Sequence, residues 1–300
     1  MKGENDMKAM SIYKGMTRRF VMCIYVLGIA MSALATGQES DVIVINGKRW
    51  ELLGKPIKAD SVLRANLLAI LPKERSISTA NWDGYKAYWS VKSDRLYLDS
   101  ITVTFFIGRN DVEVEKRLSD EDMHHVFGKY YEGDVIIARW VTDYIIRAGK
   151  GKLLFYVHGG FSRFHKNEQT LKIEQGKVVE RHSYHNKVLH KRGFSLGKVE
   201  WPEGFPRQFR LHVNDYPELA GVKSLVVIAK NMKLNKKGRL LDCDVTVRTS
   251  GQDEETSRII EGLSQEMKEK MMKLRWRTLY LNGNYYTSDL NTFVAPYVLE

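Results

Sequence analysis

The stretch from Leu241 to Leu263 changes its hydrophobic period at one glycine, Gly251. Over its first eight residues apolar and polar positions alternate, which is typical of a β-strand with one buried face. After Gly251 apolar residues recur about every four positions, which predicts an amphipathic helix. The apolar residues of the strand are Leu241, Cys243, Val245 and Val247, and those of the helix are Ile259, Leu263, Met267, Met271 and Leu274.

The alternating stretch has a natural partner just before it in the chain. Residues 223–235 pair with residues 239–250 across the turn Asn235-Lys-Lys-Gly238, which predicts a long hairpin. A last strand, residues 276–281, ends at Asn282-Gly283. The helix then covers one face of the hairpin, and strand edges stay available.

The residues before this module read mostly as strands. Residues 41–45 form a strand before an Asn-Gly turn, and residues 85–91 and 95–106 form a hairpin. Residues 59–71 predict a helix with Asp60 as its N-cap. Further strands are predicted at residues 134–141, 152–158, 170–175 and 177–184.

A proline-rich stretch, residues 201–209, divides these two blocks. We therefore expect an α+β protein with a mostly β domain over residues 41–199. A small αβ module of hairpin, helix and strand follows over residues 205–300.

The N-terminus has the pattern of an export signal. Basic residues Lys14, Arg18 and Arg19 precede an apolar run, residues 20–35, that ends in the small-x-small site Ala33-Leu34-Ala35. We expect residues 1–35 to be a signal peptide cleaved near Ala35, which places the protein in the periplasm or outside the cell. The alternative is an uncleaved segment that anchors the protein in the inner membrane.

Composition and charge indicate which classes of partner the protein can bind. The chain of 300 residues is 43% hydrophobic and 28% charged, which is ordinary for a globular protein. Removing residues 1–35 takes five basic and two acidic residues from 47 and 36, which leaves 42 and 34 and a net charge of +8. In an exported protein this charge favours anionic cell-surface material or an acidic partner rather than nucleic acid. Cys243 alone remains after cleavage, so no intramolecular disulfide forms.

The C-terminal third resembles the C-terminal domain of TonB-type energy transducers. The resemblance rests on residues in the family's order: Tyr216-Pro217, Gly221-Val222, Lys237-Gly238, residues 244–251, Trp276 and Asn282-Gly283. It implies a module that reads a short peptide segment by adding it as a strand. Thr278 stands where the family has proline, and the long proline-rich spacer of the family is absent.

The first block also resembles a family, one of uncharacterised exported bacterial proteins. The resemblance rests on Gly84-Tyr85, Trp89, the segment Leu96-Tyr97-Leu98 and the segment from Tyr156 to Glu168. It implies a fold and a bacterial source and carries no chemistry.

These patterns favour a non-enzymatic binding or assembly protein of the cell envelope. Its partner is a protein or peptide, engaged beside strand 276–281, where Trp276 and Tyr280 share a face and form the expected anchor. A membrane-anchored energy transducer for outer-membrane transport is the first alternative. No cofactor is expected, and a cleaved chain has no membrane span.

A hydrolase is the second alternative. His158 with Glu168 is the minimal pattern of a general base, although no nucleophile elbow or acidic dyad accompanies it. His182, His185 and His190, with His165, are weak candidates for a metal site, because residues three apart on a strand point to opposite faces.

Two groups of large apolar side chains are interpreted mainly as parts of the hydrophobic core. The tryptophans and tyrosines of residues 82–97 suit either a sugar-stacking surface or the buried face of a sheet. Met267, Met271 and Met272 suit a buried helix stripe.

Overall fold

A computed structural model describes residues 37–107, 112–156, 160–195, 209–222, 224–249, 259–287 and 293–298. The chain forms two compact units. Unit 1 holds the described residues up to 148 with 156–163 and 170–181, and unit 2 holds residues 149–155, 164–169 and those from 182 onward. The division therefore runs through strands β8 (Tyr144–Tyr156), β9 (Arg163–Glu174) and β10 (Lys177–His185). The boundary that the sequence predicts between residues 199 and 205 lies outside the described residues.

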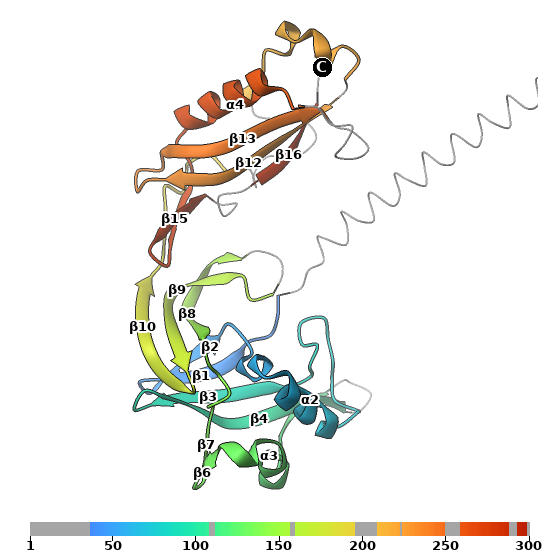
Figure 1. The fold of residues 1–300 in the computed structure, drawn as a ribbon, viewed down its shortest axis with the longest axis vertical. Helices are drawn as coiled ribbons and strands as arrows, with labels where there is room; N and C mark the ends of the chain where they lie inside the picture. Colours follow the sequence, from blue (N-terminus) through green and yellow to red (C-terminus); the bar gives the residue numbers. More distant parts are fainter. Residues whose placement is uncertain are drawn as a thin grey trace, which may run out of the picture. The chain divides into compact units, whose positions relative to one another are not determined.

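Strands dominate the described chain, which agrees with the predicted α+β class and its mostly β N-terminal part (Figure 1). The helices before residue 150 are α2 (Ser61–Ile70), α3 (Asp120–Phe127) and the short 3-10 turns η1 (Pro56–Ala59) and η2 (Gly128–Tyr130). The strands of the large sheet, besides β8 and β9, are β1 (Asp41–Ile45), β2 (Lys48–Leu52), β3 (Lys86–Lys92), β4 (Arg95–Ile107), β5 (Val112–Arg117), β6 (Tyr131–Glu132), β7 (Val135–Ile137) and β10 (Lys177–His185).

This sheet is mixed and closes on itself within unit 1. Its order is β10-β9-β8-β2-β1-β3-β4-β7-β6, with β5 beside β4, and β1 and β3 run parallel. Strand β10 also meets β4 at Lys177 and Arg95, and Leu96 N donates to Gly176 O at 2.8 Å. The strands from β10 to β4 therefore meet at one end, next to the turns Ser93-Asp94 and Gln175-Gly176.

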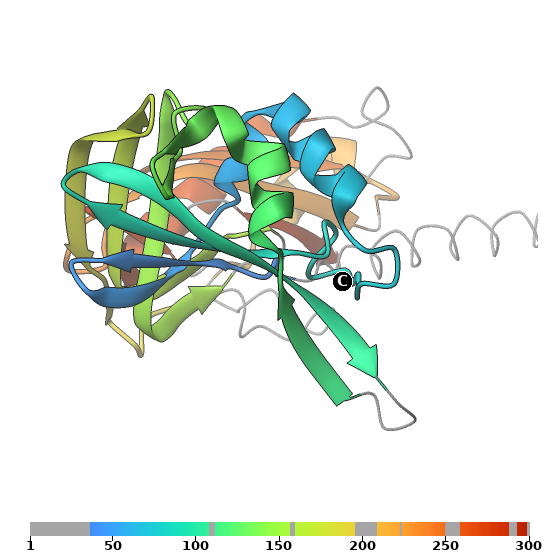
Figure 2. The ribbon, with the colours of Figure 1, turned by 90° about the horizontal axis from the view of Figure 1, so that it is seen from below.

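Two-residue turns set the hairpins of unit 1. Asn46-Gly47, Ser93-Asp94 and Gln175-Gly176 all have positive φ angles, between 46° and 74°. Such turns match the twist of the flanking strands, and they confirm the hairpins that the sequence predicts there. Beyond the closed part, β4 and β5 continue as a two-stranded arm (Figure 2).

The predicted helix of residues 59–71 is α2, shorter by a few residues. Asp60 caps it, because Leu63 N donates to its Oδ1 at 2.9 Å. The helix buries Leu63 and Leu67 in a core that also holds Tyr85 and Trp89. Tyr85 and Trp89 of the aromatic group therefore pack inside, whereas Tyr88 and Tyr97 are half-buried and Trp82 is exposed.

One buried ion pair joins three elements of unit 1. Lys55 Nζ lies 2.6 Å from Asp41 Oδ1, and both side chains are buried. Ala87 N and Trp89 Nε1 also donate to the Asp41 carboxylate, each at 3.1 Å. The pair therefore fixes β1, the segment before η1 and β3 against one another. Burial raises the pKa of Asp41, and the Lys55 ammonium opposes that rise.

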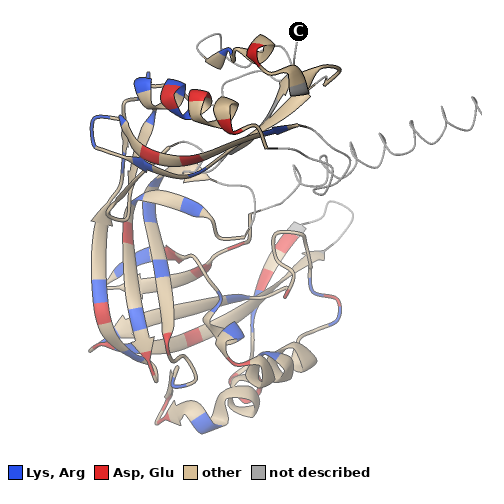
Figure 3. Ribbon diagram, turned by 45° about the horizontal axis from the view of Figure 1, so that its top comes forward, with Lys and Arg blue, Asp and Glu red and all other residues tan. Residues whose placement is uncertain are grey.

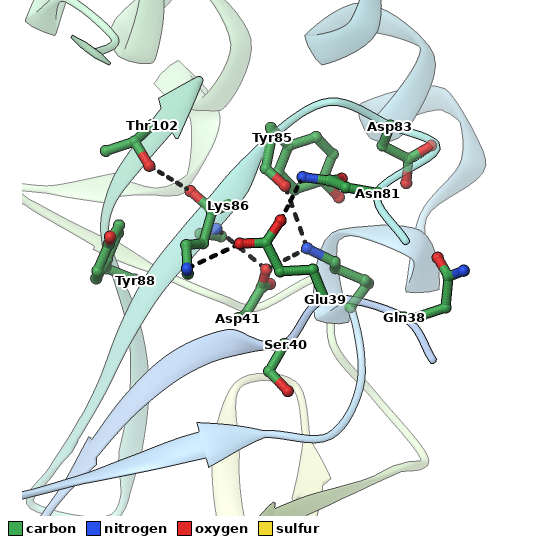
Figure 4. Close-up of polar contacts among 12 residues, drawn as sticks. Gln38, Glu39, Ser40, Asp41, Asn81, Asp83, Tyr85, Lys86, Tyr88 and Thr102 are labelled. Atoms are coloured by element: carbon green, nitrogen blue, oxygen red, sulfur yellow. Dashed lines mark hydrogen bonds and ion pairs between the residues drawn. The ribbon is translucent and has the colours of Figure 1, made fainter. Parts of the chain in front are cut away.

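A partly exposed polar cluster lies beside this pair (Figure 4). Glu39 accepts hydrogen bonds from Asn81 Nδ2 at 2.9 Å and from Lys86 Nζ at 2.8 Å. Asp83 pairs with Lys58 at 2.9 Å and with Arg64 at 2.5 Å, and these cations hold the pKa of Asp83 below its ordinary value, against burial, which raises it. Each of the two carboxylates is paired with neighbouring donors, and these contacts hold the loop before β3 in place.

Unit 2 contains two three-stranded sheets. One has the order β11-β14-β15 and the other β13-β12-β16. Their elements, with the remaining helices of the unit, are β11 (Lys187–Leu189), η5 (Val213–Asp215), η6 (Pro217–Leu219), β12 (Ser224–Leu234), β13 (Leu240–Thr249), α4 (Glu261–Lys273), β14 (Thr278–Leu281), β15 (Asn284–Thr287) and β16 (Phe293–Val298).

The predicted hairpin and helix of unit 2 are present, with two corrections. Strands β12 and β13 pair antiparallel, and α4 places Leu263, Met267 and Met271 in the core at 0% exposure. Leu241 is 59% exposed because it is the extra residue of a bulge, between Leu240, which pairs with Leu234, and Asp242, which pairs with Lys233. Ile259 is exposed because it precedes α4.

We predict that Lys55→Met lowers the free energy of unfolding at pH 7 by about 3 kcal/mol, because it leaves a buried carboxylate without its cation. Urea denaturation followed by tryptophan fluorescence measures this loss.

Lys58→Met is the matched control for this experiment. Lys58 is 43% exposed and Arg64 still neutralises Asp83, so the expected loss is under about 1 kcal/mol. Equal losses in the two variants contradict a special role for the buried pair.

Candidate functional site

The sheet β13-β12-β16 has two outer edges, one on β13 and one on β16. Hydrogen bonds to Val247 cover part of the β13 edge. Val247 N donates to Ser264 Oγ at 2.8 Å, and Ile260 N donates to Val247 O at 2.9 Å. Both polar groups of Val247 therefore point away from β12 and toward α4. Ser264 is itself buried, and its hydroxyl donates to Ile260 O at 2.9 Å. The outer edge of β13 is thus covered at Val247 by its own chain.

The same hydrogen bonds fix the direction of the backbone groups in the regular part of the ladder, from Leu225 to Lys230 of β12. Neighbouring residues of an antiparallel strand direct their N–H and C=O groups to opposite sides. Val227 pairs with Val247 on one side and with Ala295 on the other. Since Val247 points away from β12, Val227 must hydrogen-bond to Ala295.

Strand β16 consequently has alternate residues facing outward. Ala295 and Tyr297 bond to β12, and the backbone groups of Val294, Pro296 and Val298 point away from it. We call these outward groups the β16 edge. Within the described ranges no strand pairs with the β16 edge. Proline has no N–H, and it is tolerated in a sheet where its nitrogen faces outward, as at Pro296.

The two faces of this sheet also differ. Leu225, Val227 and Ala229 are buried on the side of the core. Val226 and Ile228, on the other face, are only partly buried, and Val294, which pairs with Ile228, is 65% exposed. An apolar, partly open face therefore adjoins the β16 edge. Figure 1 shows β16 and α4 on opposite sides of the β12–β13 hairpin.

Charged residues of α4 form an ion pair with β13 and, among the described residues, form none with β16. Lys268 Nζ donates to Asp242 Oδ1 at 3.1 Å, which ties α4 to β13 and holds the pKa of Asp242 below its ordinary value. Burial raises the pKa of the Cys243 thiol to about 11. A thiol with such a pKa is protonated at neutral pH and has little nucleophilic character.

The expected anchor at strand 276–281 is corrected by the structure. Trp276 is fully buried, its Nε1 donates to Met271 O at 3.1 Å, and Phe194 packs edge-on at 4.9 Å. Tyr280 is partly exposed, with its ring 5.1 Å from that of Tyr285. Strand β14 lies between β11 and β15, so both of its edges are already paired.

Glu168, the candidate catalytic carboxylate, is buried in unit 2 and holds a turn in place. It accepts from His165 N at 2.8 Å and from Asn282 Nδ2 at 2.7 Å. Asn186 bridges the same segments, donating to His165 O and accepting from Asn282 N, each at 2.8 Å. The structure thus joins β9 to the turn after β14 through Glu168. His158 lies outside the described residues.

The candidate metal ligands are not brought together. His185 Nδ1 contacts Asn167 Oδ1 at 2.9 Å, and His182 lies beside Tyr184. His190 bonds to Lys236 O, and His165 is buried next to Gly149, where an added Cβ would lie 2.2 Å from its Nδ1. In the described part of the chain no group of three or more His, Cys, Asp or Glu is arranged to hold a metal ion.

A scan against family models, curated proteins and solved structures finds no match to this chain. The site must therefore be argued from its own geometry. None of the helices in the described ranges is long and apolar enough to cross a membrane, and residues 20–35 lie outside those ranges.

Sequence reasoning missed β16 and with it the candidate site. The run Phe293–Val298 alternates poorly and contains Pro296, which lowers its score as a strand. That proline also carried the available clue, because proline in a strand-like run points to a sheet edge.

We predict that Trp276→Ala lowers the free energy of unfolding by about 3–5 kcal/mol, because it empties a fully buried site. Tyr280→Ala, in the partly exposed neighbour, costs about 1 kcal/mol. Urea denaturation compares them. Unchanged stability in Trp276→Ala would contradict the core position of this side chain.

Proposed function

We propose that this chain is an exported, non-enzymatic binding or assembly protein of the bacterial cell envelope. Its C-terminal module holds an extended segment of a partner protein along the β16 edge. The observation that carries the proposal is the outward direction of the backbone groups of Val294, Pro296 and Val298, whereas the opposite edge of the sheet is covered at Val247.

Strand addition suits the chemistry of this edge. Val294 and Val298 each offer an N–H and a C=O, and Pro296 offers a C=O alone, so a partner strand can form up to five hydrogen bonds. Each contributes about 1 kcal/mol net. Five such hydrogen bonds are enough for a weak, reversible contact. Side-chain contacts must supply the rest of the affinity.

The open apolar face supplies that completion. In strand addition main-chain bonds give affinity, and alternate side chains of the added segment give specificity. Val226, Ile228 and Val294 lie along one face next to the edge. A partner segment with apolar residues at every second position therefore fits best.

Export rests on the N-terminal pattern and has its own test. Mass spectrometry of the protein from bacterial fractions should give a soluble chain that begins near Thr36. An intact N-terminus in the inner membrane fraction would support the anchored alternative instead.

We predict that Val294→Pro abolishes partner binding without unfolding the sheet, because the nitrogen of residue 294 faces outward and is not part of the β12–β16 ladder. Pull-down from envelope extracts with the wild type and the variant measures binding, and urea denaturation checks folding. Val294→Ala, which keeps the N–H, should retain partner recovery.

A photo-crosslinking amino acid then locates the contact. Placed at residue 294, it should capture the partner, whereas placed at Val179, an exposed valine of β10 in unit 1, it should not. Equal recovery by Val294→Pro and wild type, or no partner captured by the wild type at all, counts against strand addition at β16.

A further inference from the structure

Three turns that are far apart in the sequence meet at one end of unit 2. They are residues 190–192 after β11, residues 236–239 between β12 and β13, and residues 275–277 before β14. Together they carry seven lysines and arginines, which we call the basic turn cluster: Lys191, Arg192, Lys236, Lys237, Arg239, Arg275 and Arg277. In Figure 3 lysine and arginine gather where the β12–β13 turn meets the C-terminal end of α4.

His190 holds the three turns together. Its Nε2 lies 2.7 Å from Lys236 O, and its Nδ1 lies 2.7 Å from Arg275 Nη2. A carbonyl oxygen accepts and a guanidinium donates, so Nε2 must carry the hydrogen and Nδ1 must accept. Arg275 Nε also donates to Lys237 O at 3.1 Å.

The backbones of the turns are in direct contact as well. Trp276 N donates to Gly238 O at 2.7 Å, and Phe194 N donates to Arg275 O at 2.8 Å. Gly238 has a φ of +75°, and a Cβ there would lie 2.7 Å from Trp276 O. The cluster is therefore a fixed arrangement, held by neutral backbone groups.

The positive charges of the cluster are uncompensated within the part of the chain that the structure describes. No carboxylate there forms an ion pair with any of the seven residues. Elsewhere in the same unit cations do find partners, as Lys268 does with Asp242 and Lys270 with Glu266. Like charges held together repel, so an arrangement that keeps them together favours an anionic ligand.

We propose that the basic turn cluster is a landing surface for an anionic lipid membrane. Phosphate headgroups match it because Arg binds phosphate oxygens in pairs and Lys adds point charges. Lysines and arginines near an anionic membrane surface act additively over a flat target. This inference does not depend on strand addition at β16.

A lipid surface fits better than an acidic protein because of where the apolar residues lie. Protein interfaces rely on a few aromatic or apolar anchors at their centre. Here Trp276 and Leu240 are buried behind the turns, and the lysines of the turns are exposed. Leu241, 59% exposed and two residues after Arg239, can enter the headgroup region beside the charges.

The test uses the full mature chain and lipid vesicles in a sedimentation assay. We predict that the protein binds vesicles of phosphatidylglycerol with phosphatidylcholine, does not bind phosphatidylcholine alone, and dissociates as salt rises. The triple variant Lys236→Glu, Lys237→Glu, Arg239→Glu should lower the partition coefficient by about a hundredfold or more. The clamp at His190 survives this change, because it uses the backbone carbonyls of Lys236 and Lys237.

The matched control reverses three exposed lysines of unit 1: Lys48→Glu, Lys73→Glu and Lys116→Glu. It has the same net charge and should keep at least a third of wild-type binding. Circular dichroism confirms that both variants fold.

Three results overturn the proposal. They are equal binding to neutral and anionic vesicles, an equal loss in the control, and retention on immobilised polyglutamate without vesicle binding, which would assign the cluster to an acidic protein. Val294→Pro should leave vesicle binding unchanged, so failure of strand addition and failure of membrane landing are distinguishable.

Discussion

The hydrogen bonds from Ser264 and Ile260 to Val247 decide how the C-terminal sheet meets its surroundings. They use both backbone groups of Val247 on the side away from β12. They also set the alternation of the whole ladder, so that Ala295 faces inward and Val294 faces outward. These two hydrogen bonds therefore cover the edge of β13 at Val247 and fix which backbone atoms of β16 face outward.

Strand edges differ in their surroundings at three places in the described chain. In unit 1 the pairing of Lys177 with Arg95 joins the first and last strands of the curved sheet at one end. In unit 2 Ser264 and Ile260 cover β13 at Val247, and Pro296 removes one N–H from the outer edge of β16. A proline there discourages long, indiscriminate pairing and still leaves room for a short segment. The β16 edge thereby suits a selective contact.

Buried polar groups in this protein serve packing first. Asp41 with Lys55 and Glu168 with Asn282 each join elements that are distant in sequence, and each carboxylate is satisfied by several donors. The histidines are likewise separate, and His190 acts as a clamp through its two ring nitrogens. In the part of the chain that the structure describes, the surfaces proposed for partners are the β16 edge and the basic turn cluster.

Local pattern alone determined much of the fold. The Asn-Gly and Gln-Gly turns, the Asp60 cap and the β12–β13 hairpin follow from residue types whose conformational preferences are short-range, and the structure has each of them. The stripe of Leu263, Met267 and Met271 likewise fixed which side of α4 is buried.

Tertiary structure decided the rest, because pairing between distant segments is not encoded in local period. A strand pattern at 276–281 does not say that β11 and β15 will occupy both of its edges, or that Trp276 will be buried beneath Phe194. Likewise, the three turns of the basic turn cluster form one surface only because His190 contacts both Lys236 and Arg275. The sequence by itself determined most strands and helices and which of their faces are buried. Long-range hydrogen bonding determined which strand edges and which charges stay exposed.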